Sequence, residues 1–157
     1  MISSFLKRLL FARQFYMMDG KIEILGKKQI MLPSDVVSYL QNNDSKVVYT
    51  NIKSAVSKDI EDYAKKLGSS GEGMLKNIED IFETFGLGKL EVVDLDYKNK
   101  KGVIRIYNSP LNGKSTDIQV TSAVISGIFS FLFSKEINAQ QTKPSVKMSG
   151  YHEYILR

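Results

Sequence analysis

The stretch Ile118–Ser134, IQVTSAVISGIFSFLFS, decides how this chain folds. It contains no charged residue and carries a serine at every fourth position. In an α-helix this spacing stacks the serines into one narrow stripe, with Gly127 beside it. The other faces are apolar, and a helix that is apolar on nearly every side is buried on nearly every side. We therefore predict a central helix in the core, whose stripe of small residues lets another backbone or a ligand approach closely. The serines of the stripe are Ser122, Ser126, Ser130 and Ser134.

A membrane-spanning helix is the alternative interpretation of this stretch. A span needs about 20 predominantly apolar residues, whereas this run is shorter and spends six positions on Ser, Thr and Gln. The N-terminal segment MISSFLKRLLFARQF is interrupted by Lys7, Arg8 and Arg13 and lacks the pattern of a signal peptide. We predict a cytoplasmic protein that has no membrane partner.

The composition excludes several classes of site. The 157 residues include no cysteine, which rules out disulfides, thiolate catalysis and zinc held by cysteine. His152 is the only histidine, which disfavours histidine-rich metal sites and Ser-His-Asp triads. The net charge is +5, and 18 of the 22 basic residues are lysines spread over the whole chain. Nucleic-acid-binding proteins cluster their basic residues, so we expect no nucleic-acid partner.

The spacing of apolar residues predicts one α+β domain, with a mostly antiparallel sheet, helices packed on one of its faces and the long buried helix in the C-terminal half. Gly26-Lys27 is expected to be the turn of a hairpin, and Val36, Val37 and Leu40 to be the buried face of a helix that begins near Ser34. The glycine-rich segment 68–73 lacks the residues of a phosphate-binding loop and is expected to be a break between helices. Predicted helices cover residues 3–16, 33–41, 46–67, 74–85 and 118–134, and predicted strands cover residues 21–25, 28–32, 89–97, 102–108, 136–141 and 147–156.

Few residues suggest chemistry by themselves. Asp94 and Asp96 are two apart on a predicted strand and could serve as an acid–base pair, but their position beside a lysine-rich turn favours a solvated surface. His152 lies in the last predicted strand, where a lone histidine is more often a surface or rim residue than a ligand. We therefore predict no catalytic residue, no metal and no cofactor, and favour a protein that is not an enzyme.

Aromatic residues form the candidate ligand site. Pockets for small molecules are lined mainly by apolar and aromatic side chains and contain few polar groups. If the serine stripe faces a cavity, it supplies those polar groups, and if it faces a helix, it is a close-packing surface. The sequence leaves both interpretations open. The ligand-binding residues we predict are Phe82, Phe85, Ser122, Ser126, Phe129 and Phe131.

The part of the chain after residue 44 resembles the 4-vinyl reductase domain family. The resemblance rests on GLGKLEVVDLD at Gly86–Asp96, a second strand that ends in Asn108-Ser109-Pro110, a long helix of small residues with Gly127, and a last strand after Gly150. Within this family, that part of the chain is similar to the short, stand-alone archaeal members. In this interpretation residues 1–157 are a single domain, in which residues 1–44 form an N-terminal extension and residues 45–157 form the 4-vinyl reductase-like domain.

The resemblance implies a fold shared with subunits of the TRAPP vesicle-tethering complex, and a module that binds small molecules. Members occur as the effector-sensing part of aromatic-responsive transcription activators and as a partner in bacteriochlorophyll synthesis. The sensing members hold zinc through cysteines. The corresponding positions here lie near Ile118, Lys143, Val146 and Tyr154, none of which is a plausible zinc ligand in that set.

The leading hypothesis is a non-enzymatic sensor or carrier that binds a hydrophobic or aromatic ligand between the long helix and the sheet. It is expected to be a homodimer, with the helices of residues 46–85 at the interface. The alternative is a protein-interaction scaffold of the TRAPP-subunit type that has a filled core and no ligand. A third hypothesis is an enzyme or accessory protein that acts on a tetrapyrrole.

Overall fold

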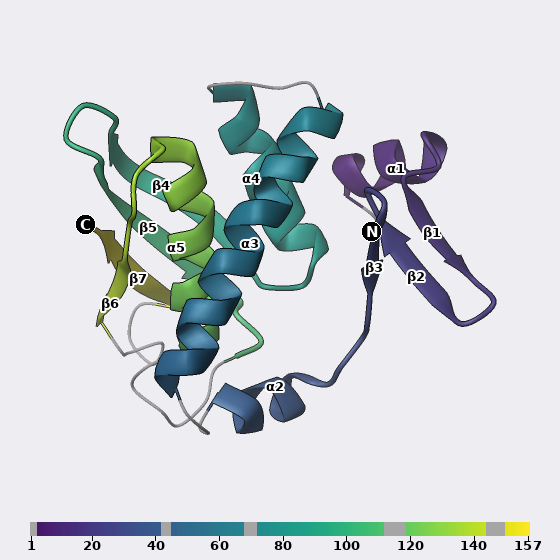
Figure 1. The fold of residues 1–157 in the computed structure, drawn as a ribbon, viewed down its shortest axis with the longest axis horizontal. Helices are drawn as coiled ribbons and strands as arrows, with labels where there is room; N and C mark the ends of the chain where they lie inside the picture. The colour runs from purple at the N-terminus through teal and green to yellow at the C-terminus, as the bar shows by residue number, and fades with distance from the viewer. Residues whose placement is uncertain (1–2, 42–44, 68–71, 112–118, 144–149) are drawn as a thin grey trace.

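The computed structural model describes residues 3–41, 45–67, 72–111, 119–143 and 150–157 (Figure 1). The described residues form a small N-terminal unit, with one helix and a three-stranded sheet, and a larger body, with three helices and a four-stranded sheet. One further helix lies between the two units in the sequence. The helices are α1 (Ser4–Phe11), α2 (Ser34–Gln41), α3 (Ser45–Leu67), α4 (Glu72–Thr84) and α5 (Gln119–Phe133). The strands are β1 (Phe15–Met18), β2 (Lys21–Ile24), β3 (Lys27–Gln29), β4 (Lys89–Asp96), β5 (Lys101–Tyr107), β6 (Ala139–Lys143) and β7 (Tyr151–Leu156).

The four-stranded sheet of the body has the order β4-β5-β7-β6, and all its neighbouring strands are antiparallel. Residues alternate between its two faces, so that Ile104 and Ile106 of β5 and Tyr154 and Leu156 of β7 point into the core. Strand β6 begins at Ala139, three residues later than predicted, because Ile137 is tied by its backbone N–H to the Ser130 hydroxyl of α5 at 3.0 Å. The predicted strands at residues 89–97 and 102–108 are confirmed as the antiparallel pair β4 and β5.

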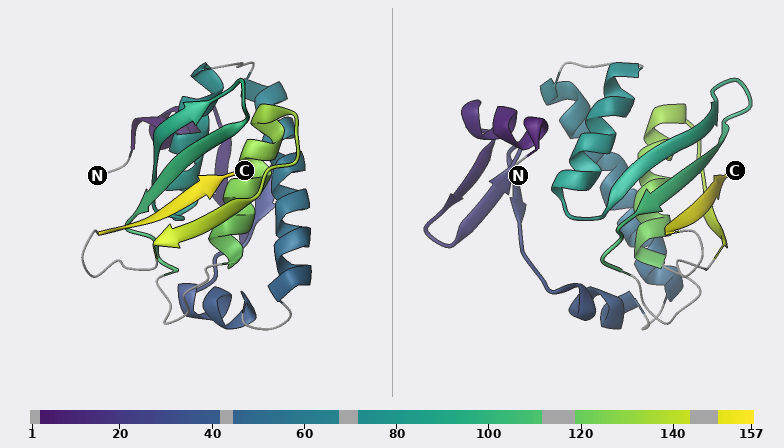
Figure 2. Two further views of the ribbon diagram at one scale, coloured as in Figure 1. Left: turned by 90° about the vertical axis from the view of Figure 1, so that its left-hand side faces the viewer. Right: turned by 180° about the vertical axis from the view of Figure 1, so that it is seen from behind.

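The helices of the body cover one face of this sheet, and no described helix covers the other face (Figure 2). Helix α5 contacts β6 and β7, α4 contacts β4, and α3 packs across α5. Ten of the fifteen residues of α5 are buried. The α+β class and the central buried helix are therefore confirmed. Within the described part of the chain, no helix combines the length and the apolar character needed to cross a bilayer.

The N-terminal unit differs from the prediction of one helix over residues 3–16. Helix α1 ends at Phe11, Arg13 takes a left-handed backbone conformation with φ of 55°, and Phe15 begins a strand that pairs with Ile24. The apolar spacing of residues 3–16 fits a helix, but pairing with β2 gives the last residues a sheet partner. Asp19-Gly20, a dipeptide that favours a two-residue hairpin turn, was the sequence signal for this hairpin.

The hairpin of β2 and β3 is confirmed, although its turn lies one residue earlier than predicted. Ile24 pairs with Lys27, so the two turn residues are Leu25 and Gly26. Both have positive φ, 52° and 77°, as the tight turn of this hand requires. Glycine adopts such angles without strain, but leucine does not. Leu25 is only 2% exposed, and burial of its side chain offsets the strain.

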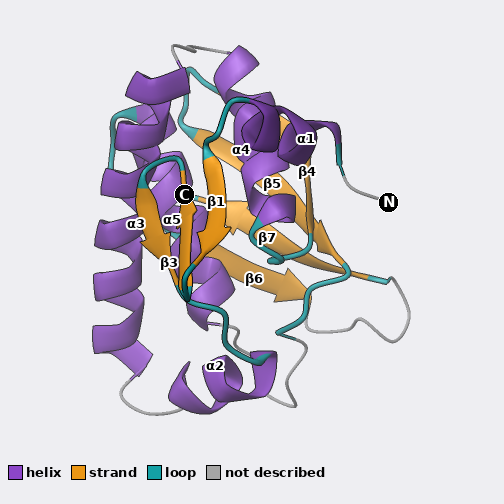
Figure 3. Ribbon diagram, turned by 90° about the vertical axis from the view of Figure 1, so that its right-hand side faces the viewer, coloured by secondary structure: helices purple, strands orange, loops and turns teal. Residues whose placement is uncertain are grey.

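Helix α2 starts at Ser34 as predicted, but its expected buried face is wrong. Val36 is 42% exposed and Leu40 is 53% exposed. The reason is its position, because α2 lies below the body and away from both sheets (Figure 3). Helices α3 and α4 agree with their predicted ranges to within two residues. The predicted features at residues 42–44, 68–71, 112–115, 118, 146 and 147–149 lie outside the described residues.

Candidate functional site

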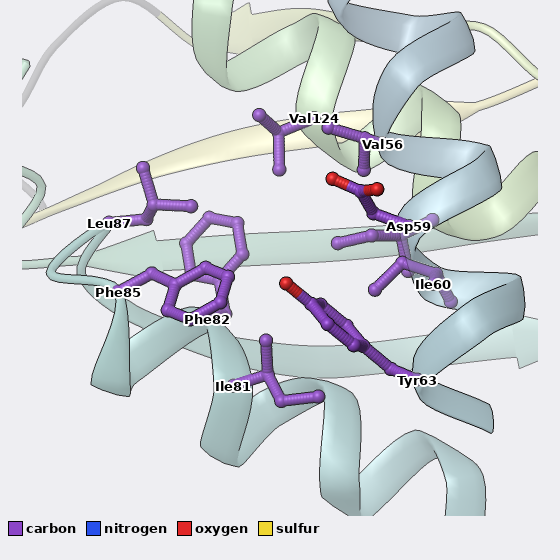
Figure 4. Close-up of a pocket in the computed structure, with 10 residues that line it drawn as sticks. Val56, Asp59, Ile60, Tyr63, Ile81, Phe82, Phe85, Leu87 and Val124 are labelled. Carbon is purple, nitrogen blue, oxygen red and sulfur yellow. The ribbon is translucent and has the colours of Figure 1, made fainter. Parts of the chain in front are cut away.

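An apolar pocket with a volume of about 170 Å³ lies between the three helices of the body. Helix α3 forms one wall, the end of α4 and the turn after it form the second, and α5 forms the third (Figure 4). Eight of the ten lining residues are apolar, as in most small-molecule sites. They are Val56, Asp59, Ile60, Tyr63, Ile81, Phe82, Phe85, Leu87, Val124 and Ile128.

Tyr63 supplies the polar group inside this pocket. Tyr63 is 2% exposed, and its ring contacts the Phe85 ring edge to face, with 6.2 Å between the ring centroids. Its hydroxyl points toward the middle of the pocket (Figure 4). Burial raises the pKa of Tyr63 to about 12, against smaller opposing effects of the Lys27 charge and a hydrogen bond from Gln29. The group is therefore a neutral hydroxyl at physiological pH, able both to donate and to accept a hydrogen bond.

Asp59 lies one helical turn before Tyr63 and forms the charged edge of the pocket. Lys27 of β3 reaches across to α3, where its ammonium lies 3.0 Å from the Asp59 carboxylate and 2.5 Å from the Asp62 carboxylate. The hydrogen bond to Lys27 lowers the pKa of Asp62, and the hydrogen bonds to the two aspartates raise the pKa of Lys27. The Lys66 ammonium also donates to the Leu25 carbonyl. The N-terminal sheet is thus held against the same helix that lines the pocket.

The structure separates the residues predicted from the sequence to bind a ligand. Phe82 and Phe85 line the pocket. Phe129 is fully buried and packs on Phe133 at 5.9 Å between ring centroids, and the partly buried Phe131 packs against the core outside the pocket lining. Ser122 and Ser126, described next, also lie outside that lining.

The serine stripe faces helix α3 and the start of β6. The Ser126 hydroxyl donates to the Ser122 carbonyl at 2.6 Å and accepts from the Ala139 backbone N–H at 2.8 Å. Beside it, a Cβ on Gly127 would lie 2.6 Å from the Lys53 carbonyl oxygen of α3. Of the two interpretations left open by the sequence, the structure selects close packing of two helices.

Asp59, Tyr63 and the aliphatic lining residues were not predicted from the sequence to belong to the site. Asp59 and Tyr63 are four apart and therefore share a face of α3, as do Val56 and Ile60. This polar pair within an apolar stripe was the sequence signal for these lining residues. It did not distinguish a pocket from a core, because the opposing walls come from α4 and α5.

The other titratable candidates have structural partners. His152 is 4% exposed, so the expectation of a surface or rim position is wrong: its side chain points inward from β7. Its Nδ1 lies 3.1 Å from the Gln141 amide nitrogen, and burial lowers its pKa. Asp96 accepts hydrogen bonds from the backbone N–H groups of Lys98 and Asn99 and from the Asn99 amide, and these bonds lower its pKa. Asp96 therefore closes a turn.

Among the described residues, no three His, Asp or Glu side chains converge in a way that could hold a metal ion. Of the positions that correspond to the family's zinc ligands, Ile118 and Val146 lie outside the described residues, and the side chain of Lys143 is not described. Tyr154 is fully buried in β7.

No family model matches the chain, and no curated protein matches it in sequence. Its structure is similar to the crystal structure of the phenol-responsive sensory domain of the transcription activator PoxR with phenol, with a TM-score of 0.74 and 13% identity over 99% of this chain and 90% of that one. The chain shares this fold. The likeness covers the N-terminal unit as well as the body.

Two further solved structures have lower TM-scores. One is a trafficking protein particle complex subunit 3 from Naegleria fowleri covalently bound to palmitic acid, with a TM-score of 0.48 and 16% identity over 79% of this chain and 88% of that one. The other is a vinyl-4-reductase family protein from Methanocaldococcus jannaschii, with a TM-score of 0.46 and 15% identity over 83% of each chain. Both come from groups that the sequence resemblance named. Of the three structures, the sensory domain alone supports the inferences below.

Proposed function

We propose that this chain binds one small aromatic molecule in the pocket between α3, α4 and α5, and acts as a sensor or carrier. The observation that carries the proposal is an apolar pocket of about 170 Å³ with one neutral hydroxyl inside it. An apolar cavity of about 150 Å³ accommodates benzene. A single six-membered ring with a small substituent is therefore the size of ligand that fits.

The polar groups of the pocket favour a ring that carries a hydroxyl or an amine. Tyr63 can accept a hydrogen bond from such a group or donate one to it. Asp59 keeps part of its carboxylate accessible, with 46% of its side chain exposed beside Lys27. The fold shared with a phenol-responsive sensory domain supports the same class of ligand.

Binding of phenol to the full chain tests the proposal. Isothermal titration calorimetry should give one site per chain, and phenol should raise the melting temperature, because a ligand that binds the folded state stabilises it. Tyr63→Phe should weaken phenol binding about two- to tenfold, the range expected for the loss of one neutral hydrogen bond. The same variant should leave binding of toluene unchanged, since toluene has no hydroxyl.

Tyr97→Phe is the matched control, because Tyr97 is 45% exposed and lies outside the pocket lining. It should leave the affinity for phenol unchanged. The proposal is wrong if millimolar phenol produces neither heat of binding nor a shift in melting temperature. It is also wrong if Tyr97→Phe and Tyr63→Phe weaken binding equally, since the hydroxyl in the pocket then has no special role.

A homodimer is the second part of the proposal, and the exposed apolar side chains favour a different surface from the one predicted. In the described part of the chain, twelve of the fifteen exposed large hydrophobic side chains lie between Leu10 and Val47. In the predicted interface, by contrast, Ile60, Tyr63 and Ile78 are buried in the chain's own core. Large exposed apolar patches on soluble proteins mark contact surfaces. We therefore propose that the interface lies on α2, whose Val36, Tyr39 and Leu40 side chains are exposed.

A further inference from the structure

A second apolar hollow adjoins the pocket. It is an open groove of about 470 Å³ between the N-terminal unit and the turn that joins α4 to β4. Its outer wall comes from Phe15 and Met17 of β1, Ile22 of β2 and Met31 after β3. In Figure 1 these strands lie to the right of the body. The opposite wall of the groove comes from Thr84 at the end of α4 and from the turn after it.

The groove and the pocket share a wall. Phe85 and Leu87 line both, on either side of Gly86, which has φ of 73°. A second link comes from Gln29, which lines the groove and whose amide acts to lower the pKa of Tyr63 in the pocket. The two hollows therefore adjoin at this turn.

We infer that the groove holds an apolar tail of the ligand whose ring occupies the pocket, so that the ligand class is a phenol with a linear alkyl substituent. This inference rests on the proposed function. The pocket has room for little more than a ring, and the groove beside it is larger and lined mainly by apolar side chains. Met17 and Met31 are 58% and 77% exposed, and such unbranched, flexible side chains adapt to tails of different length.

Calorimetric titration of the full chain with phenol, 4-ethylphenol, 4-butylphenol and 4-hexylphenol tests this inference. Each methylene that enters the groove should tighten binding about fourfold. Met17→Glu and Met31→Glu place a charge in the groove, and because both residues are exposed, the fold should tolerate them. Both variants should flatten the gain in affinity with tail length and leave the affinity for phenol itself unchanged.

Val93→Glu is the matched control, since Val93 is 44% exposed on β4 and lies outside the groove lining. It adds the same charge and removes an apolar side chain, and it should preserve the full dependence on tail length. If phenol binds but the groove variants keep the wild-type dependence on tail length, the inference is wrong and the proposed function stands.

If neither phenol nor any alkylphenol binds, the proposed function and the inference both fail. Light scattering on the same variants measures whether they change the oligomeric state. If Met31→Glu changes the oligomeric mass but not the dependence on tail length, the groove is occupied by a second copy of the chain, and the inference is overturned.

Discussion

The hydroxyl of Tyr49 on α3 lies 2.7 Å from the hydroxyl of Ser126 on α5, 77 positions later in the chain. Either hydroxyl can be the donor of this bond, because the Ser126 hydroxyl also faces the Ser122 carbonyl and the Tyr49 hydroxyl also faces Asn138 Oδ1. Because Ser126 also accepts from the Ala139 backbone N–H, one small side chain joins α3, α5 and the start of β6. The fully buried Ser126 thus fixes the spacing of the layers that enclose the pocket.

We expect Ser126→Leu to destabilise the protein by about 1–3 kcal/mol, the usual cost of overpacking a tight site. The larger side chain removes three hydrogen bonds and presses on α3. Chemical denaturation measures the change. Ser54→Leu on the exposed side of α3 is the control and should have little effect. Equal denaturation curves for Ser126→Leu and the wild type would contradict the close packing of α3 and α5.

Gly127→Ala is expected to destabilise the protein, although alanine favours helices by about 1 kcal/mol over glycine. The new Cβ would meet the Lys53 carbonyl oxygen at 2.6 Å and the Val56 Cβ at 3.0 Å, and a backbone oxygen cannot move aside cheaply. Gly73→Ala in α4 is the matched control, because a Cβ there has no neighbour within 4 Å. Thermal melts should move in opposite directions, down for Gly127→Ala and up for Gly73→Ala.

His152 should make stability depend on pH below about 6.5. Burial lowers its pKa in the folded state below the ordinary value of 6.5, so the unfolded state binds more protons as the pH falls through this range. The contribution of His152 to stability is therefore complete above pH 6.5 and is lost as the pH falls through the lower folded-state pKa. His152→Gln should remove this part of the pH dependence.

NMR measures the folded-state pKa directly, since the chain has one histidine and one set of imidazole signals. A titration midpoint above 6.5 would show that the ring is not held neutral by burial, and the pH prediction would then be wrong.

Lys27→Met should loosen the N-terminal sheet from α3. The ammonium of Lys27 bridges Asp59 and Asp62, and its removal leaves two carboxylates close together on one helix. Hydrogen exchange of the β2 and β3 amides should become faster, whereas exchange in β5 and β7 should not change. Lys28→Met is the control on the same strand, because Lys28 is exposed. Equal protection in the two variants would show that the bridge does not hold the sheet.

Light scattering at micromolar concentration should give about twice the mass of the 17.7 kDa chain. Tyr39→Glu and Leu40→Glu should give monomers if the exposed apolar side chains of α2 form the interface. Tyr63→Arg, by contrast, is expected to unfold the chain, because Tyr63 is 2% exposed in a monomer. A single 17.7 kDa species for the unmodified chain would rule out the dimer.

The regular elements of the body could be predicted from the sequence because local pattern and tertiary packing agree there. The uncharged run around Gly127 can only be buried, and the alternation of β5 fits one buried and one exposed face. The two-residue turns could be expected from Gly20 and Gly26, although only the second was recognised.

The ends of elements in the N-terminal unit could not be predicted in the same way. Phe15 continues the helical spacing of α1, but it is in a strand because β2 offers it backbone partners. Val36 and Leu40 form an apolar stripe that is nevertheless exposed. Phe15 is in a strand because of its pairing with β2, and the apolar stripe of α2 is exposed because no described element covers it. The local sequence encodes neither the position of β2 nor that of α2 relative to the body.

The sequence by itself therefore determined the α+β class, the central helix, the hairpins and an aromatic-rich interior that contains Phe82 and Phe85. Only the tertiary structure decided that the serine stripe meets α3, that Tyr63 points into a pocket and that a groove adjoins it. The physical reason is that periodicity shows which face of a helix avoids water, but a pocket forms where three such faces leave a volume unfilled. That volume depends on the distances between helices, which Ser126 and Gly127 set through contacts with residues more than 70 positions away in the chain.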